Sequence, residues 1–396
     1  MRKACLFSYI LCLLIRFSLE AREVLGWIAS YHVDAGKEAL QLDCGEYSPK
    51  DAITTIALQF WLPTFDGEVM LDTAEGASDE AVKELKALAD SYNIKTLLCI
   101  YNYFNDKWDW DDLAVGAFTT HKSTFIKALV DEVKKYDLDG IDLDLEAMDD
   151  REQDKQAYIT FVKELAPELH AIGKTLSLAS FNTPCFNAPN MSWWEELKED
   201  IDNFHTMNYS EGYEYCEKTE PYCTTDPSQH GEKVYKYSYT MQYGLDKGVD
   251  TAAISIGLMA LTSWGDPEQD VNYHLQSILD LNAIPGICIW ELTRNSGIWA
   301  TSEVWEKLSV IKKHGEQSQI DEKQSLQQGT LVSRPRTYKI VGNTCTVPKE
   351  YRSIKHTAEV YSLQGKLIDR IRLTGNGTLS FNGPRKSMHV RLVKFH

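Results

Sequence analysis

Residues 139–146 read Asp-Gly-Ile-Asp-Leu-Asp-Leu-Glu, and this alternation is the part of the sequence that decides the fold. Successive side chains of a β-strand point to opposite faces, so Asp142, Asp144 and Glu146 share one face and the aliphatic side chains between them share the other. Such a strand suits the wall of a parallel barrel, with its aliphatic face packed on helices and its acidic face turned inward. We therefore predict a buried strand that carries a carboxylate cluster.

The acidic face of this strand indicates chemistry. Three carboxylates inside a barrel repel one another and lose hydration, a cost that is tolerable when they share protons. Glu146 lies nearest the carboxyl end of the strand, where the active sites of such barrels are found. Asp144 is expected to raise the pKa of Glu146 and make it a proton donor near neutral pH. The alternatives are a solvated edge strand and a magnesium or calcium site.

Eight short apolar runs, this stretch among them, recur along residues 22–315 and predict buried parallel strands. Helical patterns lie between them, such as the capped start at Ser78 and the four-residue spacing that begins at Phe125. The predicted strands are Val24–Ser30, Ile53–Trp61, Thr96–Tyr101, Gly140–Glu146, Thr175–Ser180, Asn203–Tyr209, Ala252–Leu258 and Gly286–Trp290. This order predicts an α/β fold, a (β/α)8 TIM barrel. An open doubly wound sheet is the second choice, but no glycine-rich phosphate loop follows the first run.

Both ends of the chain predict further segments. Residues 1–21 begin with the basic pair Arg2 and Lys3, continue with an apolar run and end in a small residue, which is typical of a secretory signal peptide, so we expect a secreted protein. No other segment is long and apolar enough to predict a membrane span. Residues 316–335 are polar and predict a linker. Residues 336–396 alternate around glycine turns and predict a small all-β C-terminal domain.

The charge of the chain excludes one class of function and supports two units. The 396 residues carry a net charge of −17, which repels phosphates and argues against a nucleic-acid binder. Residues 334–396 hold 13 Lys and Arg against 3 Asp and Glu, whereas the preceding residues have a balance of −27. A shift of this size indicates two units with different tasks.

Seven cysteines remain after the predicted signal peptide, so an exported chain would keep at least one free thiol. Cys216 and Cys223 flank a short polar loop and are a plausible local disulfide. Cys99 and Cys288 lie in apolar runs and are predicted to be buried thiols. No Cys/His spacing is typical of zinc, and the ten histidines are taken as structural.

Residues 139–146 match the D-G-x-D-x-D-x-E signature, and on it the chain resembles glycoside hydrolase family 18, the chitinases and endo-β-N-acetylglucosaminidases. The resemblance extends over residues 22–315, the predicted catalytic domain. Gln59–Trp61 resembles the second strand of the family, and Met207–Tyr209 matches its M-x-Y motif. Residues 287–290 resemble its eighth strand, which ends in a tryptophan at the floor of the sugar site.

The resemblance implies a retaining, substrate-assisted hydrolysis in which the 2-acetamido oxygen of the sugar attacks its own anomeric carbon. Glu146 would protonate the leaving oxygen and then activate water. Asp144 would hold the acetamido N–H, and Asp142 would share a proton with Asp144. Tyr209 would donate its hydroxyl to the acetamido group. The implied substrate-binding residues are Trp290, which would stack under the sugar ring, and Met207, Trp61 and Asn208. No metal or other cofactor is expected, and the expected state is a monomer.

Three departures from the family pattern are visible. The third strand ends Cys99-Ile-Tyr-Asn where the family has S-x-G-G, so a weaker hydrogen-bonding group replaces the serine that supports the first aspartate. Ser210 follows Tyr209 where aspartate is usual, and Glu211 is the candidate substitute. The short connection before Val271 leaves no room for the extra α+β domain of many chitinases. A shallow, open cleft suited to internal cleavage is expected.

Three functions remain open on these grounds. The first is a secreted endo-acting chitinase whose partner is a polysaccharide of N-acetylglucosamine. The second is an endo-β-N-acetylglucosaminidase that cuts the chitobiose core of N-glycans. The third is a glycan-binding protein without activity, against which the intact Glu146, Asp144 and Tyr209 argue. Residues 360–367, Val-Tyr-Ser-Leu-Gln-Gly-Lys-Leu, and the closing residues 390–395 resemble the sorting domains of some secreted bacterial proteins. A carbohydrate-binding module or a basic docking patch are the alternatives for this C-terminal segment.

Overall fold

The computed structural model describes the chain in the following ranges: 22–184, 187–209, 237–260, 271–281, 283–293 and 297–327, with side chains up to residue 314, and six strands beyond residue 336. The predictions for the signal peptide, for Ser210 and Glu211 and for the Cys216–Cys223 pair lie outside these residues. The chain divides into two compact units, Met1–Ser318 and Gln319–His396, and each is described by itself.

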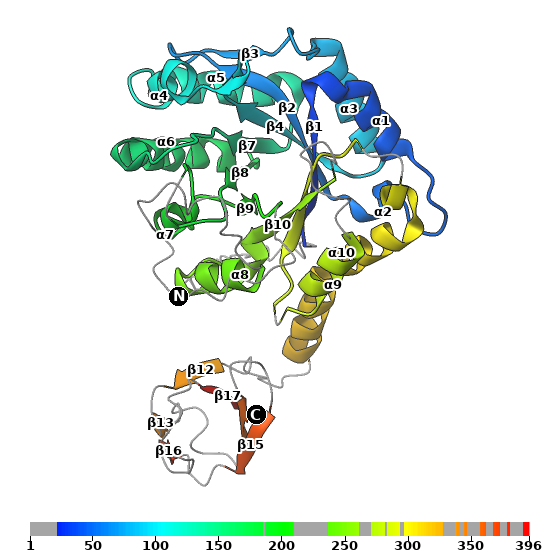
Figure 1. Ribbon diagram of the computed structural model, residues 1–396, viewed down its shortest axis with the longest axis vertical. Coiled ribbons are helices and arrows are strands. Elements are labelled where there is room, and N and C mark those ends of the chain that lie inside the picture. Colours follow the sequence, from blue (N-terminus) through cyan, green and yellow to red (C-terminus); the bar gives the residue numbers. More distant parts are fainter. Residues whose placement is uncertain are drawn as a thin grey trace, which may run out of the picture. The chain divides into compact units, whose positions relative to one another are not determined.

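The first unit is a closed barrel of eight parallel strands (Figure 1). The strands are β1 Val24–Ala29, β2 Thr55–Pro63, β4 Lys95–Tyr101, β7 Gly140–Asp144, β8 Thr175–Ser180, β9 Asn203–Thr206, β10 Ile254–Met259 and β11 Gly286–Trp290. They pair in the order β1-β11-β10-β9-β8-β7-β4-β2, and β1 pairs with β2 to close the ring. Each strand falls within or next to its predicted run. The barrel prediction is confirmed, and closure excludes the open sheet.

Helices surround this barrel (Figure 1). The longer ones are α1 Val33–Gln41, α3 Asp79–Ser91, α5 Lys122–Tyr136, α6 Glu152–His170, α8 Tyr237–Asp246, α9 Val271–Leu279 and α10 Ser302–Gln327. Short turns of helix are α2 Pro49–Ala52, α4 Val115–Phe118 and α7 Trp194–Leu197, and β3 Val69–Leu71 adds an antiparallel strand beside β2. The predicted cap of α3 is present, because the Ser78 hydroxyl accepts a hydrogen bond of 3.1 Å from the Ala81 N–H.

The barrel wall has two faces of different composition. Outward-facing aliphatic side chains of β7, such as Ile141 and Leu143, belong to the large buried core that the strands form with the helices. The inner face holds a small apolar layer made of Leu25, Trp27, Ala57, Leu97, Cys99, Ala179 and Cys288. Cys99 and Cys288 are buried free thiols, as predicted. A Cβ on Gly140 would lie 2.3 Å from the carbonyl oxygen of Thr175, so only glycine lets β7 and β8 pair this closely.

One strand departs from regular alternation. On β2, Gln59 pairs with Cys99 of β4, whereas Trp61, two residues on, pairs with Ile100, the very next residue of β4. The extra residue on β2 is a β-bulge, which changes the face to which the following side chains point. Gln59 therefore faces the barrel interior while Trp61 faces the helices, on the same side as Ile100.

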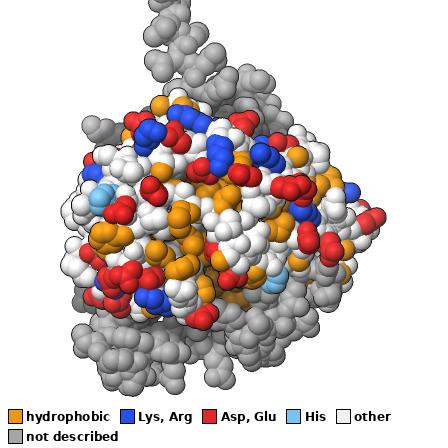
Figure 2. Space-filling model, turned by 90° about the horizontal axis from the view of Figure 1, so that it is seen from above, with side chains coloured by type: hydrophobic (Ala, Val, Ile, Leu, Met, Phe, Trp, Pro, Cys, Tyr) orange, Lys and Arg blue, Asp and Glu red, His pale blue; other side chains and the backbone are white. Residues whose placement is uncertain are grey.

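The surface of the first unit carries both signs of charge. On the face shown in Figure 2, hydrophobic side chains gather toward the middle, and acidic and basic ones are interspersed around them. The net negative charge is therefore not gathered there into one acidic patch. Among the described residues, no helix has the length and apolar character that crossing a membrane requires.

Beyond the barrel the chain is helical as far as Gln327, so the first part of the predicted linker, residues 316–335, belongs to α10. The strands described in the second unit are β12 Thr337–Ile340, β13 Thr344–Thr346, β14 Thr357–Tyr361, β15 Leu367–Arg372, β16 Thr378–Ser380 and β17 Arg391–Phe395. They pair antiparallel in the orders β12-β17-β14-β15 and β13-β16. The all-β domain and its limits stay a prediction.

Candidate active site

Asp144 and Glu146 lie together at the carboxyl end of β7. Asp144 is the last residue of the strand, and the two residues are 5% and 6% exposed. Their carboxyl groups are hydrogen-bonded to each other. Asp144 also accepts a hydrogen bond of 2.6 Å from the side-chain amide of Gln59, which reaches inward from β2. The pair therefore has the geometry to hold one proton between two carboxylates.

The electrostatics of the pair place this proton on Glu146. Burial, followed by the charge of Asp142, raises the pKa of Asp144 to about 7. Burial and the neighbouring charge of Asp144 raise the pKa of Glu146 well above its ordinary value, in the direction predicted. Within the pair Glu146 is the donor and Asp144 the acceptor. A protonated Glu146 beside an ionised Asp144 is the arrangement that a general acid needs.

Asn102 fixes the backbone at Glu146. Its side-chain oxygen accepts a hydrogen bond of 2.7 Å from the Glu146 N–H, and its amide donates one of 2.8 Å to the Glu146 carbonyl oxygen. Asn102 follows directly after β4 and is fully buried. The residue that departs from the family pattern at the end of this strand thus holds Glu146 in register beyond the end of β7.

Asp142, one inward position below Asp144, accepts hydrogen bonds from three side chains. Its Oδ2 accepts from the indole N–H of Trp27 at 2.8 Å. Its Oδ1 accepts from the Ser177 hydroxyl at 2.6 Å and lies 2.8 Å from Nδ1 of His205. Burial alone would raise the pKa of Asp142, but the charge of His205 and these donors outweigh it and lower that pKa. These contacts favour the ionised form of Asp142, and the sharing of a proton between Asp142 and Asp144 stays a prediction.

Tyr209 and Trp290 are brought to the same end of the barrel. Tyr209 follows β9, and its ring packs so closely on β10 that a Cβ on Gly257 would lie 2.9 Å from its Cε1. Burial, together with Cys288 and the carboxylates of Asp144 and Glu146, raises the pKa of Tyr209 well above its ordinary value, so the phenol keeps its proton. Trp290 ends β11, is half-buried and packs on the inner apolar layer.

Met207 is also half-buried at this end, and its N–H donates to the Ser180 carbonyl at 2.9 Å. Asn208, by contrast, is fully buried, accepts from the Thr206 hydroxyl and donates to the Thr240 hydroxyl of α8 at 3.2 Å. Its polar groups are therefore engaged within the fold. The structure contradicts the prediction that Asn208 binds substrate.

Trp61 also lies away from the acids. The bulge on β2 turns it outward, where it is fully buried and donates its indole N–H to Glu132 of α5 at 3.0 Å. Its ring packs on that of Tyr136, with 5.9 Å between the ring centroids. The prediction that Trp61 contacts the sugar is wrong, because the strand wall separates it from the site.

Five residues that support the acids were not among the predicted site residues. They are Trp27, Gln59, Asn102, Ser177 and His205. All but Asn102 occupy inward positions of predicted strands, so the alternation that revealed the acids was also the signal for them. His205, an inward residue of the predicted strand Asn203–Tyr209, is the clearest such case.

A buried pair of carboxyl groups at the carboxyl end of a TIM barrel, one of them able to donate a proton, is typical of a glycoside hydrolase. The sequence profile of the glycosyl hydrolases family 18 matches residues 23–331, and the chain belongs to this family. Membership of this family makes the protein a glycoside hydrolase.

Solved structures share this fold. A chitinase from Chromobacterium violaceum superposes with a TM-score of 0.53 and 17% identity, over 72% of this chain and 99% of that one. The chitinase ChiB from the chitin utilization locus of Flavobacterium johnsoniae has a TM-score of 0.51 and 17% identity, over 74% of this chain and 95% of that one. The spore cortex-lytic enzyme SleL of Bacillus cereus has a TM-score of 0.50 and 14% identity, over 74% of each chain. No curated protein sequence matches the chain.

Proposed function

We propose that the protein is an endo-acting chitinase, which hydrolyses β-1,4 linkages between N-acetylglucosamine units with retention of configuration. The observation that carries this proposal is the buried, hydrogen-bonded Asp144–Glu146 pair, with the phenol of Tyr209 at the same end of the barrel. A family 18 enzyme takes its nucleophile from the substrate, so one acid and one anion suffice.

The proposed reaction has two displacements at one carbon. The acetamido oxygen of the sugar attacks the anomeric carbon, while Glu146 gives its proton to the leaving glycosidic oxygen. Asp144, ionised, accepts the acetamido N–H and stabilises the positive oxazolinium-like intermediate, and Tyr209 donates its hydroxyl to the same group. Glu146, now a carboxylate, takes a proton from water as that water attacks the anomeric carbon. The oxazolinium ring opens, which restores the acetamido group, and the configuration at the anomeric carbon is retained.

The substrate class is supported by the family and by the shape of the chain. Two of the solved structures named above are chitinases, one of them encoded in a chitin utilization locus. The connection from β10 to α9, residues 260–270, is short, which fits the open cleft expected of an enzyme that cuts within a polymer. Because the third structure named above is a spore cortex-lytic enzyme, spore cortex is a substrate worth including in the test.

Parallel assays test this function. The protein and its Glu146→Gln variant are incubated with a chitin hexamer, a high-mannose glycoprotein and isolated spore cortex, and the products are separated by mass. We expect cleavage of the hexamer at internal bonds, and none by the variant. Release of the N-glycan alone would replace the proposal with endo-β-N-acetylglucosaminidase activity. Binding without cleavage of any substrate would indicate a glycan-binding protein.

The substrate-assisted mechanism has its own test. Fully deacetylated polymer lacks the acetamido oxygen and cellulose lacks the whole group, so both should be cut negligibly, because an intramolecular nucleophile is worth several kcal/mol, on the order of 7 in well-oriented cases. A thiazoline mimic of the cyclised intermediate should inhibit. A first product of inverted configuration, or equal rates on acetylated and deacetylated polymer, would overturn the mechanism. Prolonged chelation should leave the rate unchanged.

Secretion and the C-terminal unit belong to the same proposal. We propose that residues 1–21 are removed on export and that residues 336–396, basic in sequence, sort the protein or hold it on a surface. Mass spectrometry of the exported protein tests the first part. Deletion of residues 336–396, followed by measurement of where the protein accumulates, tests the second.

A further inference from the structure

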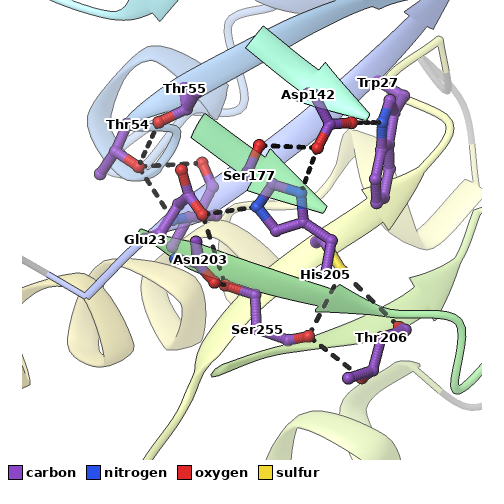
Figure 3. A network of polar contacts seen from close by, with 12 residues as sticks. Glu23, Trp27, Thr54, Thr55, Asp142, Ser177, Asn203, His205, Thr206 and Ser255 are labelled. Atoms are coloured by element: carbon purple, nitrogen blue, oxygen red, sulfur yellow. Dashed lines mark hydrogen bonds and ion pairs between the residues drawn. The ribbon is translucent and has the colours of Figure 1, made fainter. Parts of the chain in front are cut away.

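His205 stands between two carboxylates inside the barrel. Its Nδ1 is 2.8 Å from Oδ1 of Asp142, and its Nε2 is 2.7 Å from Oε2 of Glu23, the residue before β1. Figure 3 shows the imidazole ring bridging these two acids, with Ser177 and Trp27 at Asp142. The ring is fully buried.

These contacts define the charge of the ring. Asp142 already accepts from the indole of Trp27 and the hydroxyl of Ser177, so it meets His205 as an acceptor. A neutral imidazole has one N–H, whereas two bonds of this length to ionised carboxylates need an N–H on each nitrogen. His205 is therefore an imidazolium. Burial lowers the pKa of His205, but Asp142 and Glu23 outweigh it and raise that pKa to about 10.

The other titratable groups at this network are neutral or belong to the acid pair. The thiols of Cys99 on β4 and Cys288 on β11 face Asp142, and burial raises the pKa of each, so both keep their protons. Asp144 feels the charges of both Asp142 and His205. The charge balance below the acid pair is thus set by Glu23, His205 and Asp142.

We infer that His205 is a positioning residue for catalysis: as a cation between Glu23 and Asp142, it holds Asp142 as an anion and so leaves the catalytic proton to Asp144 and Glu146. Without this cation Asp142 would compete with Asp144 and Glu146 for protons, and the pKa values of Asp142 and Asp144 would rise. The consequence for the rate rests on the proposed function, whereas the charge of His205 does not.

The charge of His205 is measured directly on the unaltered protein. In a sample with ¹⁵N-labelled histidine, the ring nitrogens of His205, assigned by loss of their signals in His205→Gln, should both be protonated from pH 5 to pH 8. In Glu23→Gln the ring should lose its proton at a pH about one unit lower or more, because one of its two anions is gone. A neutral ring in the unaltered protein at pH 7 would overturn the inference, whatever the enzyme cleaves.

The consequence for catalysis is measured with His205→Gln. Removing a positive charge raises the pKa values of nearby carboxyls, so the acid limb of the kcat/KM profile on a chitin oligomer should move up by about one pH unit. On that limb the rate should fall about tenfold, the factor that a one-unit shift implies. The matched control is His170→Gln, which removes a surface histidine that pairs with Asp202 at 2.9 Å and should leave the profile in place.

The outcomes separate the two proposals. A structural role for His205 would lower the amount of folded enzyme without moving the acid limb, and an unmoved limb in an active variant would overturn the inference. If His205→Gln does not fold, His205→Asn repeats the kinetic test with a smaller amide, and the assignment then uses that variant. If the unaltered protein cleaves no acetamido sugar, the proposed function fails, while the nitrogen spectrum still decides the charge of His205.

Discussion

Two buried tryptophans on neighbouring strands make the same kind of bond on opposite sides of the barrel wall. Trp27 of β1 donates its indole N–H to Asp142 inside the barrel at 2.8 Å, and Trp61 of β2 donates to Glu132 outside it at 3.0 Å. Asp142 is fully buried beneath the acid pair, whereas Glu132 lies near the surface and also pairs with Lys135. The inner bond serves the chemistry, and the outer bond serves the fold.

The difference extends to the whole wall. The outer face joins strands to helices through a large apolar core, in which aromatic rings such as Phe118, Phe125, Tyr158 and Phe161 contact one another. The inner face holds a small apolar layer together with buried ionised groups, which cost free energy unless they are paired. The stability of the fold therefore comes chiefly from the outer face, whereas the charged site on the inner face lowers it.

The largest effect is expected from a pair of glutamates, one on each side of the wall. Glu146→Gln keeps the shape of the side chain but removes the transferable proton, so kcat should fall by about 10²–10⁴-fold or more while oligosaccharide binding is kept. Glu132→Gln, the outer control, should leave kcat unchanged. Kinetics and a binding isotherm on a chitin oligomer measure both. Turnover by Glu146→Gln within tenfold of the unaltered enzyme would remove Glu146 from the role of acid.

The next effect concerns the cost of the inner site as a function of pH. The pKa of Asp144 is raised to about 7 in the folded protein, above its unfolded value near 4. Between these values the folded chain binds more protons than the unfolded chain, so this group makes stability fall as the pH rises from about 4 to about 7.

Asp144→Asn removes this titration. Its gain in stability should therefore be larger at pH 8 than at pH 5, by a difference of a few kcal/mol at most, since Glu146 shares the proton. Thermal unfolding at both pH values measures it, and activity should be lost at both. An equal change in Tm at the two pH values would show that the pKa of Asp144 is not raised in the folded protein.

Local sequence patterns were enough to predict the fold. The eight runs became the eight strands because run length and aliphatic content are local properties, and alternation along residues 139–146 placed the acids on the inner face. The same reasoning identified Cys99 and Cys288 as buried. These predictions hold because a strand in a closed barrel leaves each side chain two choices of face.

The errors arose where alternation stops. The bulge on β2 shifted Trp61 to the outer face, and a bulge depends on the pairing of two strands rather than on one sequence. β9 ends at Thr206, so Asn208 lies beyond the region where alternation applies. The partnership of His205 with Glu23 joins residues 182 positions apart, which no local pattern indicates.

A smaller effect is expected at Asn102, which holds the backbone of Glu146 by two hydrogen bonds. Asn102→Ala removes both and leaves Glu146 free to shift, so kcat should fall by up to about 10²-fold, the scale of an ångström of misplacement. KM should change less, because Asn102 is fully buried and does not meet the substrate. Steady-state kinetics on the folded fraction measure the two constants. A loss of stability with unchanged kcat would mean that the clamp is structural.

The smallest effect returns to the two tryptophans. Trp61→Phe removes the bond to Glu132 and part of the packing on Tyr136, so the free energy of unfolding should fall by about 1–3 kcal/mol while the pH profile of activity stays in place. Trp27→Phe should cost a similar amount of stability, since its indole is equally buried. It should also move the acid limb of the profile upward by less than His205→Gln does, because the bond from Trp27 lowers the pKa of Asp142 and its loss lets that pKa rise. Urea unfolding and the pH dependence of kcat/KM, measured on both variants, distinguish the role of the inner face from that of the outer face. If both variants moved the acid limb equally, or neither did, the barrel wall would not divide chemistry from packing at these residues, and the role of Asp142 as a fixed anion would fall with that division.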